Sequence, residues 1–554
     1  MGTIQSLIKE CFPFPFLREH QLGTIEKIVN AWLAGKKFVL LRAATGAGKS
    51  CIAYTAAKVL RKIIETKHDE EMAGPFCSLT PQMRSLQKQY ATSFDIPILW
   101  GSEHYACPLF PEDKEVHFGG PLCRKDQCIK YSQCDYVLAR RTFTHTEIGT
   151  TNISFLLNAE DIKPTILVID EAHRVEQSLC GHFSLSFLLS QYKAGLQTSV
   201  RNDICTIDES ASIWKVLQGL LQLNTDEKKE NILPFLYFLR RKITGLWLAT
   251  DACKKLMQTK LDLRGLRKTE RDNLQAISTT TDFWEYFIHR IHYFIENDNW
   301  ILMSESREDN EENRILKPLS AKYYANELFQ RSSNILLMSA TLPETIAQDL
   351  GIEDYEYIDV PSTFPVERHP VLIRQDLGSL VFSNRTEQLP KFVKALDETI
   401  EKYFLDCRVV VHSISFENAQ FILDNSSFKD RMIIPKTEDL LEIQSLLSGK
   451  EDAILVGPQM LEGLDLKDDL CRGIIFLKVP WGDLGNKWIK EKMITDSEWY
   501  VRSAVISWEQ GVGRGCRSSE DFCISVCLDE QFIRLIEKGE NYMSQTFRER
   551  IHYI

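Results

Sequence analysis

The segment FVLLRAATGAGKS has the residue types and the spacing that hold a nucleotide phosphate. Gly46 and Gly48 allow the backbone to turn its amides inward around phosphate oxygens. The Lys49 ammonium would reach the terminal phosphates, and the Ser50 hydroxyl is a ligand for Mg²⁺. The pattern begins with Ala43, where glycine is more usual, but an apolar run precedes it and a helix is expected from about Lys49. This strand, turn and helix predict a phosphate-binding loop.

Two carboxylates end another apolar run, in the segment TILVIDEAH. A strand is expected from Thr165 to Ile169, so Asp170 and Glu171 would lie at the carboxyl edge of a parallel sheet, where ligands bind. Asp170 would hold Mg²⁺ there, and Glu171 would orient and deprotonate an attacking water. Without the phosphate-binding loop, a charged helix cap would be the simpler interpretation. Together the two motifs predict ATP hydrolysis.

Four cysteines lie between these two motifs, at Cys107, Cys123, Cys128 and Cys134. Their segment is rich in charged residues, glycine and proline, so it cannot build a hydrophobic core and needs a metal to hold it together. Zinc sites prefer two-residue gaps between paired cysteines, whereas the gaps here contain fifteen, four and five residues. The spacing favours an iron–sulfur cluster over zinc but leaves the choice open. Four unrelated buried thiols are the remaining alternative.

The composition predicts an intracellular globular protein of several domains. Of the 554 residues, 44% are hydrophobic and 26% are charged, and no run of about 18 apolar residues predicts a membrane span. We see no secretory signal, and fifteen cysteines fit reduced thiols better than disulfides. A net charge of −11 argues against a protein that coats nucleic acid indiscriminately, but it allows a local basic groove.

The letters DEAH, residues 170–173, resemble the second motif of superfamily 2 helicases, and segments similar to the other motifs occur in the expected order. Residues 78–90 resemble the strand-to-helix element that grips the nucleic-acid backbone. Residues 339–341 resemble the motif that couples hydrolysis to strand movement, and residues 408–416 are similar to the opening strand of a second motor domain.

The resemblance also implies roles around the nucleotide. The FPFLREHQ segment would place Arg18 and Gln21 at the base, and the LEGLDL segment would link the nucleotide to the bound strand. Arg514 and Arg517 would reach across the cleft as arginine fingers, although an exposed basic helix is the plainer alternative. The expected nucleotide contacts are Arg18, Gln21, Thr45, Gly46, Ala47, Gly48, Lys49, Ser50, Gly463 and Asp465, and the expected catalytic residues are Lys49, Asp170, Glu171, Gln510, Arg514 and Arg517.

The position of the cysteines, with an aromatic residue following in CDY, resembles the XPD/DinG family of iron–sulfur helicases. That resemblance implies a four-iron four-sulfur cluster on all four cysteines, in a small domain that acts as a wedge. Asp135 departs from the proline that is common in the family. The insert also combines aromatic side chains for base stacking with basic ones for phosphate contacts, although each alone is more simply surface or packing. These are Tyr105, Phe118, Tyr131, Tyr136, Arg124, Lys125, Lys130, Arg140 and Arg141.

An α/β fold is therefore expected, with two RecA-like parallel-sheet motor domains and two insertions in the first. The expected parts are motor domain 1 (1–100, 148–173 and 315–360), an iron–sulfur domain (101–147), a helical arch (174–314) and motor domain 2 (361–554). Apolar residues recur at helical spacing in the arch, and the acidic run Ser304 to Asn313 is expected to be a solvated loop. We expect core packing around Trp284, His289, His292 and Tyr293, and either base stacking or packing for Trp481.

The resemblance implies an ATP-dependent DNA helicase that moves 5′ to 3′ on single-stranded DNA and serves DNA repair. ATP, Mg²⁺ and the cluster would be its cofactors, and tailed or forked duplexes its substrates. A monomer is expected, with no membrane partner, in the cytoplasm or nucleoid, or in the nucleus of a eukaryote. An ATP-driven DNA clamp, a protein-stripping translocase and a remodeller of RNA–DNA hybrids remain alternatives, because their sequences would look alike.

Overall fold

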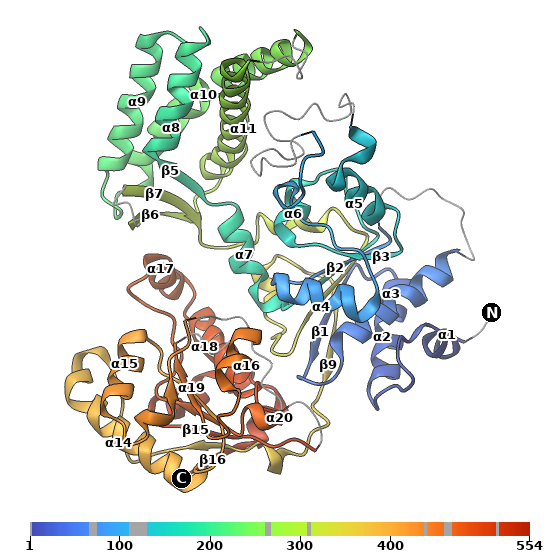
Figure 1. Cartoon of the computed structure of the whole chain (residues 1–554), viewed down its shortest axis with the longest axis vertical. Helices are drawn as coiled ribbons and strands as arrows, with labels where there is room; N and C mark the ends of the chain where they lie inside the picture. Colours follow the sequence, from blue (N-terminus) through green and yellow to red (C-terminus); the bar gives the residue numbers. More distant parts are fainter. Residues whose placement is uncertain are drawn as a thin grey trace.

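Two parallel sheets and one antiparallel sheet organise the chain (Figure 1). We call the corresponding parts the first α/β domain, the second α/β domain and the helical insertion. This architecture confirms the expected α/β class. The computed structural model describes residues 3–65, 75–109, 130–260, 267–306, 312–436, 440–458, 468–516 and 520–554.

The described sheet of the first α/β domain has six parallel strands in the order β3-β2-β4-β8-β1-β9. Its central strands are apolar on both faces, and every residue of β4 is buried, as expected for a sheet covered on both sides. The strands are β1 Phe38–Ala43, β2 Cys77–Thr80, β3 Ile148–Thr150, β4 Ile166–Asp170, β8 Asn334–Ser339 and β9 Tyr355–Val360. The helices are α1 Ile4–Cys11, α2 Gln21–Leu33, α3 Lys49–Glu65, α4 Arg84–Phe94, α5 Asp135–Thr144, α6 Ile153–Asn158, α7 Val175–His182, α12 Ala325–Phe329 and α13 Ile346–Asp349.

The helical insertion packs long helices on an antiparallel sheet in the order β5-β7-β6. Gly195 lies against Trp284, and a Cβ atom there would be 2.8 Å from the indole, so the helices pack this closely only with glycine. The helices are α8 Leu189–Arg201, α9 Ile207–Gln222, α10 Lys229–Lys260 and α11 Lys268–Glu296, and the strands are β5 Leu185–Leu188, β6 Trp300–Ser306 and β7 Glu312–Pro318.

This small sheet corrects one expectation about the acidic run. Both ends of the expected loop are strand: Ser304 pairs with Arg314, and Ser306 pairs with Glu312. Backbone pairing with β7 holds these polar strand ends, because the ladder needs only main-chain groups. The helical spacing of the surrounding sequence gave no sign of a sheet.

The expected packing around Trp284 is correct for the tryptophan, which is fully buried between the helices of the insertion. His289 and His292 are exposed instead, and His292 lies near Glu296 on the same helix. The two histidines therefore belong to the solvent face of α11.

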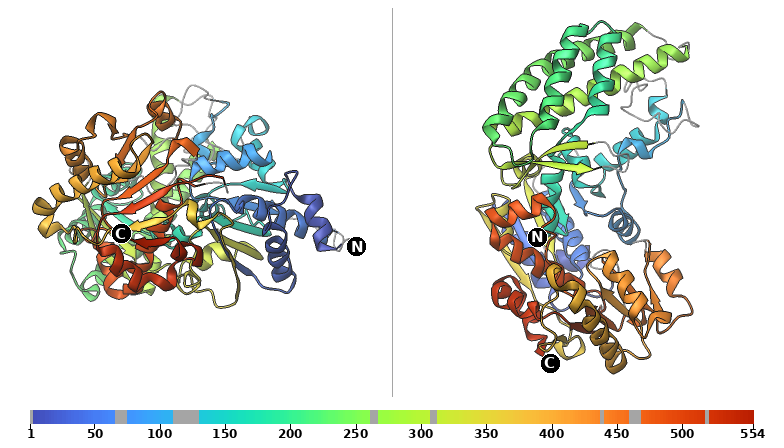
Figure 2. Two further views of the ribbon diagram at one scale, coloured as in Figure 1. Left: turned by 90° about the horizontal axis from the view of Figure 1, so that it is seen from below. Right: turned by 90° about the vertical axis from the view of Figure 1, so that its left-hand side faces the viewer.

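The described sheet of the second α/β domain has seven parallel strands in the order β12-β13-β11-β14-β15-β10-β16. The strands are β10 Val371–Ile373, β11 Val409–His412, β12 Met432–Ile433, β13 Ile454–Gly457, β14 Gly473–Phe476, β15 Ile524–Cys527 and β16 Ile551–Tyr553. The helices are α14 Arg385–Tyr403, α15 Phe416–Asn425, α16 Leu440–Leu447, α17 Lys487–Thr495, α18 Ser497–Val512, α19 Gln531–Gly539 and α20 Gln545–Glu549. Figure 2 shows this domain at the opposite end of the molecule from the long helices.

Helices α17 and α18 join the second α/β domain to the first α/β domain and to the helical insertion. Trp488 of α17 is 2% exposed, and its indole N–H donates to the carbonyl at the end of β7 over 2.7 Å. Lys492 forms a buried ion pair with Glu176 of α7, with 2.6 Å between the charged atoms. Arg502 and Asp349 form a second buried pair, at 2.5 Å. These contacts hold the two halves together beside the base of the helical insertion.

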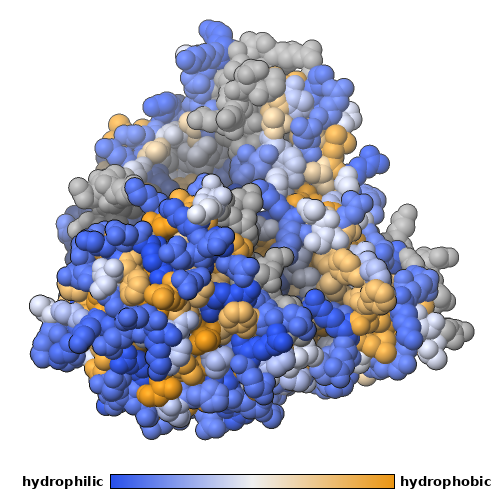
Figure 3. Space-filling model, turned by 60° about the horizontal axis from the view of Figure 1, so that its bottom comes forward, coloured by the Kyte–Doolittle hydropathy of each residue, from blue (hydrophilic) through white to orange (hydrophobic). Residues whose placement is uncertain are grey.

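In the described part of the chain, no helix is both long enough and apolar enough to cross a membrane. The face drawn in Figure 3 is largely hydrophilic, and its hydrophobic residues form small separate groups.

Candidate functional site

The phosphate-binding loop between β1 and α3 is held from outside by Gln21. Gly46 and Gly48 adopt φ angles of +85° and +79°, which L side chains rarely adopt. The Gln21 amide nitrogen donates to the Ala47 carbonyl at 3.0 Å, and its oxygen accepts from the Arg18 amide at 2.8 Å. A Cβ atom on Gly48 would lie 2.4 Å from the Gln21 nitrogen, so this close approach also requires glycine. The expected base-contacting residues thus lie directly beside the loop.

Asp170 is the last residue of β4 and Glu171 follows it, at the same sheet edge as this loop. Asp170 is 5% exposed, and burial together with neighbouring Glu171 raises its pKa to about 6. Burial alone would raise the pKa of Glu171, but His173, Lys49 and Arg514 lower it below its ordinary value. The Ser50 hydroxyl and the Asp170 carboxylate offer the oxygen ligands that Mg²⁺ prefers. A cation would also neutralise the buried Asp170 carboxylate.

A chain of hydrogen bonds connects Glu171 to the second α/β domain. Ser339 donates its hydroxyl to Glu171 Oε2 at 3.1 Å, and His173 Nδ1 lies 2.9 Å from the Ser339 oxygen. Burial lowers the pKa of His173 to about 4, so its imidazole is neutral near pH 7. Gln510 Nε2 lies 3.0 Å from His173 Nε2 and 3.2 Å from the Thr341 hydroxyl. With Nδ1 as donor to Ser339, Nε2 is free to accept from Gln510, so the network fixes the tautomer.

The turn after α18 meets the phosphate-binding loop across the domain boundary. A Cβ atom on Gly513 would lie 3.3 Å from the Thr45 hydroxyl, so little space separates the two domains here. Burial raises the pKa of Glu171, and Arg514, which follows Gly513, is among the groups that lower it. Burial lowers the pKa of His412, and Arg514 lowers it further. Arg514 is therefore near the expected water-activating carboxylate.

Comparisons with known proteins agree with this geometry. A family model described as Helicase C-terminal domain matches residues 371–550, and one described as Type III restriction enzyme, res subunit, matches residues 15–199. A solved structure named XPD_Helicase has a TM-score of 0.60 at 15% identity, covering 98% of this chain and 100% of that chain. The S. tokodaii Xpd4 structure has a TM-score of 0.58 at 13% identity, covering 97% of this chain and 100% of that chain. The fold is therefore similar to that of the XPD structures, and residues 371–550 match a helicase C-terminal family.

Curated relatives point to the same family over shorter stretches. The ATP-dependent DNA helicase CHL1 of Kluyveromyces lactis is 20% identical over 493 residues, which are 76% of this chain and 59% of the relative. The 3'-5' exonuclease DinG of Staphylococcus saprophyticus is 25% identical over 195 residues, 34% of this chain and 21% of the relative. The chain thus spans between a fifth and three fifths of the length of these relatives.

Two of the four expected cluster cysteines, Cys107 and Cys134, lie in the described residues. Tyr105 and Tyr136 make an edge-to-face contact with ring centroids 5.6 Å apart, and this brings together the segments that carry Cys107 and Cys134. Cys123 and Cys128 lie outside the described residues. Within the ranges given above, no three His, Cys, Asp or Glu side chains are grouped to bind a metal. The cluster and its four cysteine ligands stay a prediction.

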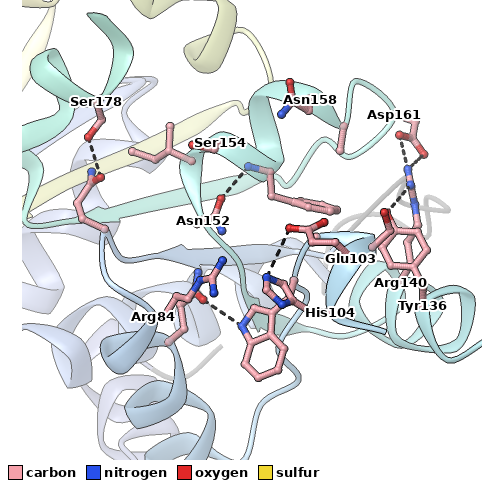
Figure 4. A pocket seen from close by; sticks show the side chains of 18 residues that line it. Arg84, Glu103, His104, Tyr136, Arg140, Asn152, Ser154, Asn158, Asp161 and Ser178 are labelled. Carbon is pink, nitrogen blue, oxygen red and sulfur yellow. Dashed lines mark hydrogen bonds and ion pairs between the residues drawn. The ribbon is translucent and has the colours of Figure 1, made fainter. Parts of the chain in front are cut away.

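A cavity of about 730 Å³ lies between the cysteine insert and the start of α4 (Figure 4). Gln87 and Trp100 form one wall, where the indole N–H donates to the amide oxygen at 3.1 Å. On another wall, Arg140 pairs with Asp161, and the buried Tyr136 hydroxyl accepts from Arg140. Both Arg140 and Tyr136 are therefore already engaged by protein groups. Tyr131 is more exposed, at 38%.

Several other expected residues have no structural description. Arg517, Gly463 and Asp465 lie outside the described residues, as do the insert residues Phe118, Arg124 and Lys125. Trp481 is described: it stacks on Tyr500 with centroids 5.2 Å apart and donates to Gln531 at 3.2 Å. This favours the packing role for Trp481.

Sequence reasoning missed one residue at the site. The Tyr90 hydroxyl donates to Asp170 Oδ2, although the two residues are 80 positions apart. Tyr90 belonged only to a segment expected to grip nucleic acid. Its position on the apolar face of α4 indicated burial, but nothing local indicated its partner.

Proposed function

We propose that this protein is an ATP-dependent DNA helicase that moves 5′ to 3′ on single-stranded DNA and separates duplexes with an iron–sulfur wedge, in DNA repair. The observation that carries the proposal is the contact of Gln510 with His173 and Thr341. It links the second α/β domain to the residues around Glu171. An ATPase whose catalytic groups come from two domains can convert hydrolysis into relative domain movement.

Each residue has a role in this proposal. Lys49 neutralises charge on the terminal phosphates, and Glu171 takes a proton from the attacking water. Ser50 and Asp170 would hold Mg²⁺, which neutralises charge between the phosphates. Arg514, with Arg517, would stabilise charge on the transferring phosphoryl group, and Gly463 and Asp465 would respond to the nucleotide. Hydrolysis then weakens the contacts between the domains.

The cysteine insert supplies the proposed wedge. When bound to Cys107, Cys123, Cys128 and Cys134, a four-iron four-sulfur cluster would crosslink a segment that has little core of its own. The insert borders the cavity at α4, the helix expected to grip the strand. Tyr131, which is 38% exposed, and Lys130, whose ammonium donates to Gln133 at 2.7 Å, lie at the end of the insert, where a passing strand would contact them. We propose that the protein acts as a monomer on tailed or forked DNA. Its location would be the cytoplasm or the nucleoid, or the nucleus of a eukaryote.

Strand displacement tests the proposal. Anaerobically purified protein is mixed with matched duplexes that carry either a 5′ or a 3′ single-stranded tail, with ATP, and Lys49→Ala serves as control. Displacement of only the 5′-tailed duplex, and none by Lys49→Ala, is the expected result. Hydrolysis stimulated by single-stranded DNA without displacement would identify a clamp or a translocase. Displacement of an RNA–DNA hybrid alone would identify a hybrid remodeller.

A further inference from the structure

The Tyr90 hydroxyl lies between the two groups assigned to magnesium. Tyr90 is 2% exposed and lies on the buried face of α4. Its hydroxyl donates to Asp170 Oδ2 and also hydrogen-bonds to the Ser50 side chain. A phenol has one proton, and because that proton goes to Asp170, the phenol oxygen must accept from Ser50. The three side chains form a directed chain from Ser50 through Tyr90 to Asp170.

This direction of the hydrogen bonds leaves lone pairs on the Ser50 and Asp170 oxygens open for a cation. Mg²⁺ binds oxygen lone pairs, so a serine ligand must send its own proton elsewhere. Ser50 sends its proton to Tyr90. Asp170 Oδ1 accepts from the Glu171 amide at 2.9 Å and Oδ2 accepts from Tyr90, but each carboxylate oxygen has a second acceptor position. Tyr90 therefore orients Ser50 and Asp170 and still leaves oxygen lone pairs on both for the metal.

Packing fixes the Tyr90 ring between two helices. The ring lies 6.1 Å from that of Phe94, which stacks on Tyr54 of α3 at 4.5 Å and 10°. Helix α3 begins at Lys49 and therefore carries Ser50 in its first turn. Movement of α4 relative to α3 would shift the hydroxyl away from Ser50 and Asp170.

Helix α4 also borders the proposed strand path. Its first turn contains Arg84, which is exposed and lines the cavity. Gln87 is one turn before Tyr90 and accepts from the Trp100 indole on the cavity wall. A ligand that contacts this end of α4 thus acts on the helix that carries the Tyr90 hydroxyl.

We propose that Tyr90 is a positioning residue that holds Ser50 and Asp170 in register for Mg²⁺ and connects them to α4. Strand binding at α4 would then raise the affinity for magnesium, and by linkage magnesium would raise the affinity for the strand. The inference rests on the proposed function, because it takes the Mg²⁺ ligands and the strand contact from it.

The test measures binding of a fluorescent ATP analogue during a Mg²⁺ titration, with and without single-stranded oligothymidylate. Tyr90→Phe removes the hydroxyl and keeps the ring. Tyr54→Phe is the matched control, because Tyr54 belongs to the same aromatic group and no described contact joins it to Asp170. We expect the half-saturating Mg²⁺ concentration to rise about tenfold in Tyr90→Phe, as for other residues that orient metal ligands, and not in Tyr54→Phe. The response of this value to the oligonucleotide should also disappear.

The readouts separate a positioning role from a structural one. Affinity for the analogue without Mg²⁺ and the thermal unfolding midpoint should match the parent, because packing and the phosphate-binding loop are unchanged. A parent-like Mg²⁺ titration of Tyr90→Phe would overturn the positioning role, and a shifted titration with an unchanged oligonucleotide response would overturn the coupling. Tyr90→Met, with no hydroxyl, repeats the test if the phenylalanine variant unfolds. If the parent shows no Mg²⁺-dependent binding that Lys49→Ala abolishes, the proposed function falls as well.

Discussion

Gln510 of the second α/β domain lies 3.0 Å from the Nε2 atom of His173 in the first. The other nitrogen of this imidazole, Nδ1, hydrogen-bonds to Ser339, and the Ser339 hydroxyl donates to Glu171. The position of the second domain is therefore connected by hydrogen bonds to the carboxylate proposed to activate water. The rate of hydrolysis would therefore depend on the position of the second α/β domain, although that domain makes none of these hydrogen bonds to Glu171 directly.

Gln510→Ala should lower kcat for ATP hydrolysis by about tenfold, since a rate factor of ten corresponds to about 1.4 kcal/mol and a hydrogen bond is worth about that much. KM for ATP should change little, because Gln510 contacts other protein groups. Steady-state kinetics with single-stranded DNA give both values. Gln531→Ala, which removes the partner of Trp481 elsewhere in the same domain, is the control and should retain parent kcat. Equal losses in both variants would contradict the proposed connection.

Cys107→Ser and Cys134→Ser should each abolish the visible absorption of anaerobically purified protein, because a cluster needs all four thiolates. Bound iron and acid-labile sulfide provide the measurement. Cys253→Ser serves as the control, since Cys253 lies on α10 of the helical insertion and should leave the absorption intact. A colourless parent that contains zinc would show that the spacing was misinterpreted.

Lys492→Ala should lower the free energy of unfolding by about 3–5 kcal/mol, because it removes the charged partner of the buried Glu176 carboxylate and leaves the Trp499 indole N–H, at 2.9 Å, donating to it. The Lys492 and Glu176 side chains are only 6% and 4% exposed. Chemical denaturation measures the change. Lys487→Ala on the same helix breaks a pair with Asp226, which is 78% exposed, and should have a much smaller effect. Similar losses would mean that burial does not set the strength of the pair.

His412→Phe should make the protein more resistant to acid. Burial, with Arg514 nearby, lowers the pKa of His412 to about 3 in the folded state, against about 6.5 when unfolded. As the pH falls, the His412 imidazole is therefore protonated in the unfolded state before the folded state. The free energy of unfolding decreases progressively between about pH 6.5 and pH 3 for this reason. At pH 5.5 the free energy of unfolding is about 1.4 kcal/mol lower than at neutral pH because of this protonation. Phenylalanine cannot be protonated, so the variant avoids this loss, and its ring can still stack on Phe476. Unfolding followed from pH 7.5 to 5 checks this.

His292→Phe is the control for that measurement. The His292 side chain is 52% exposed, so its replacement should leave the pH dependence of stability unchanged. Parallel curves for the parent and His412→Phe would contradict the assignment of the acid sensitivity to His412.

Elements with local signals could be recognised from the order of the amino acids. Apolar runs that end in glycine or carboxylate predicted β1 and β4, and Lys49 begins α3 where the pattern placed it. The order of the motifs also predicted two parallel-sheet domains, and this is confirmed. These features are set by a few neighbouring residues, so they can be recognised along the chain.

Contacts between side chains far apart along the chain are visible only in the folded protein. The contacts from Tyr90 to Asp170, from Gln510 to His173 and from Lys492 to Glu176 join residues 80, 337 and 316 positions apart. The β6–β7 pairing also escaped prediction, because polar strand ends are held by main-chain bonds to a partner strand. Such contacts depend on how helices and sheets pack, and no local pattern of residue types encodes that packing.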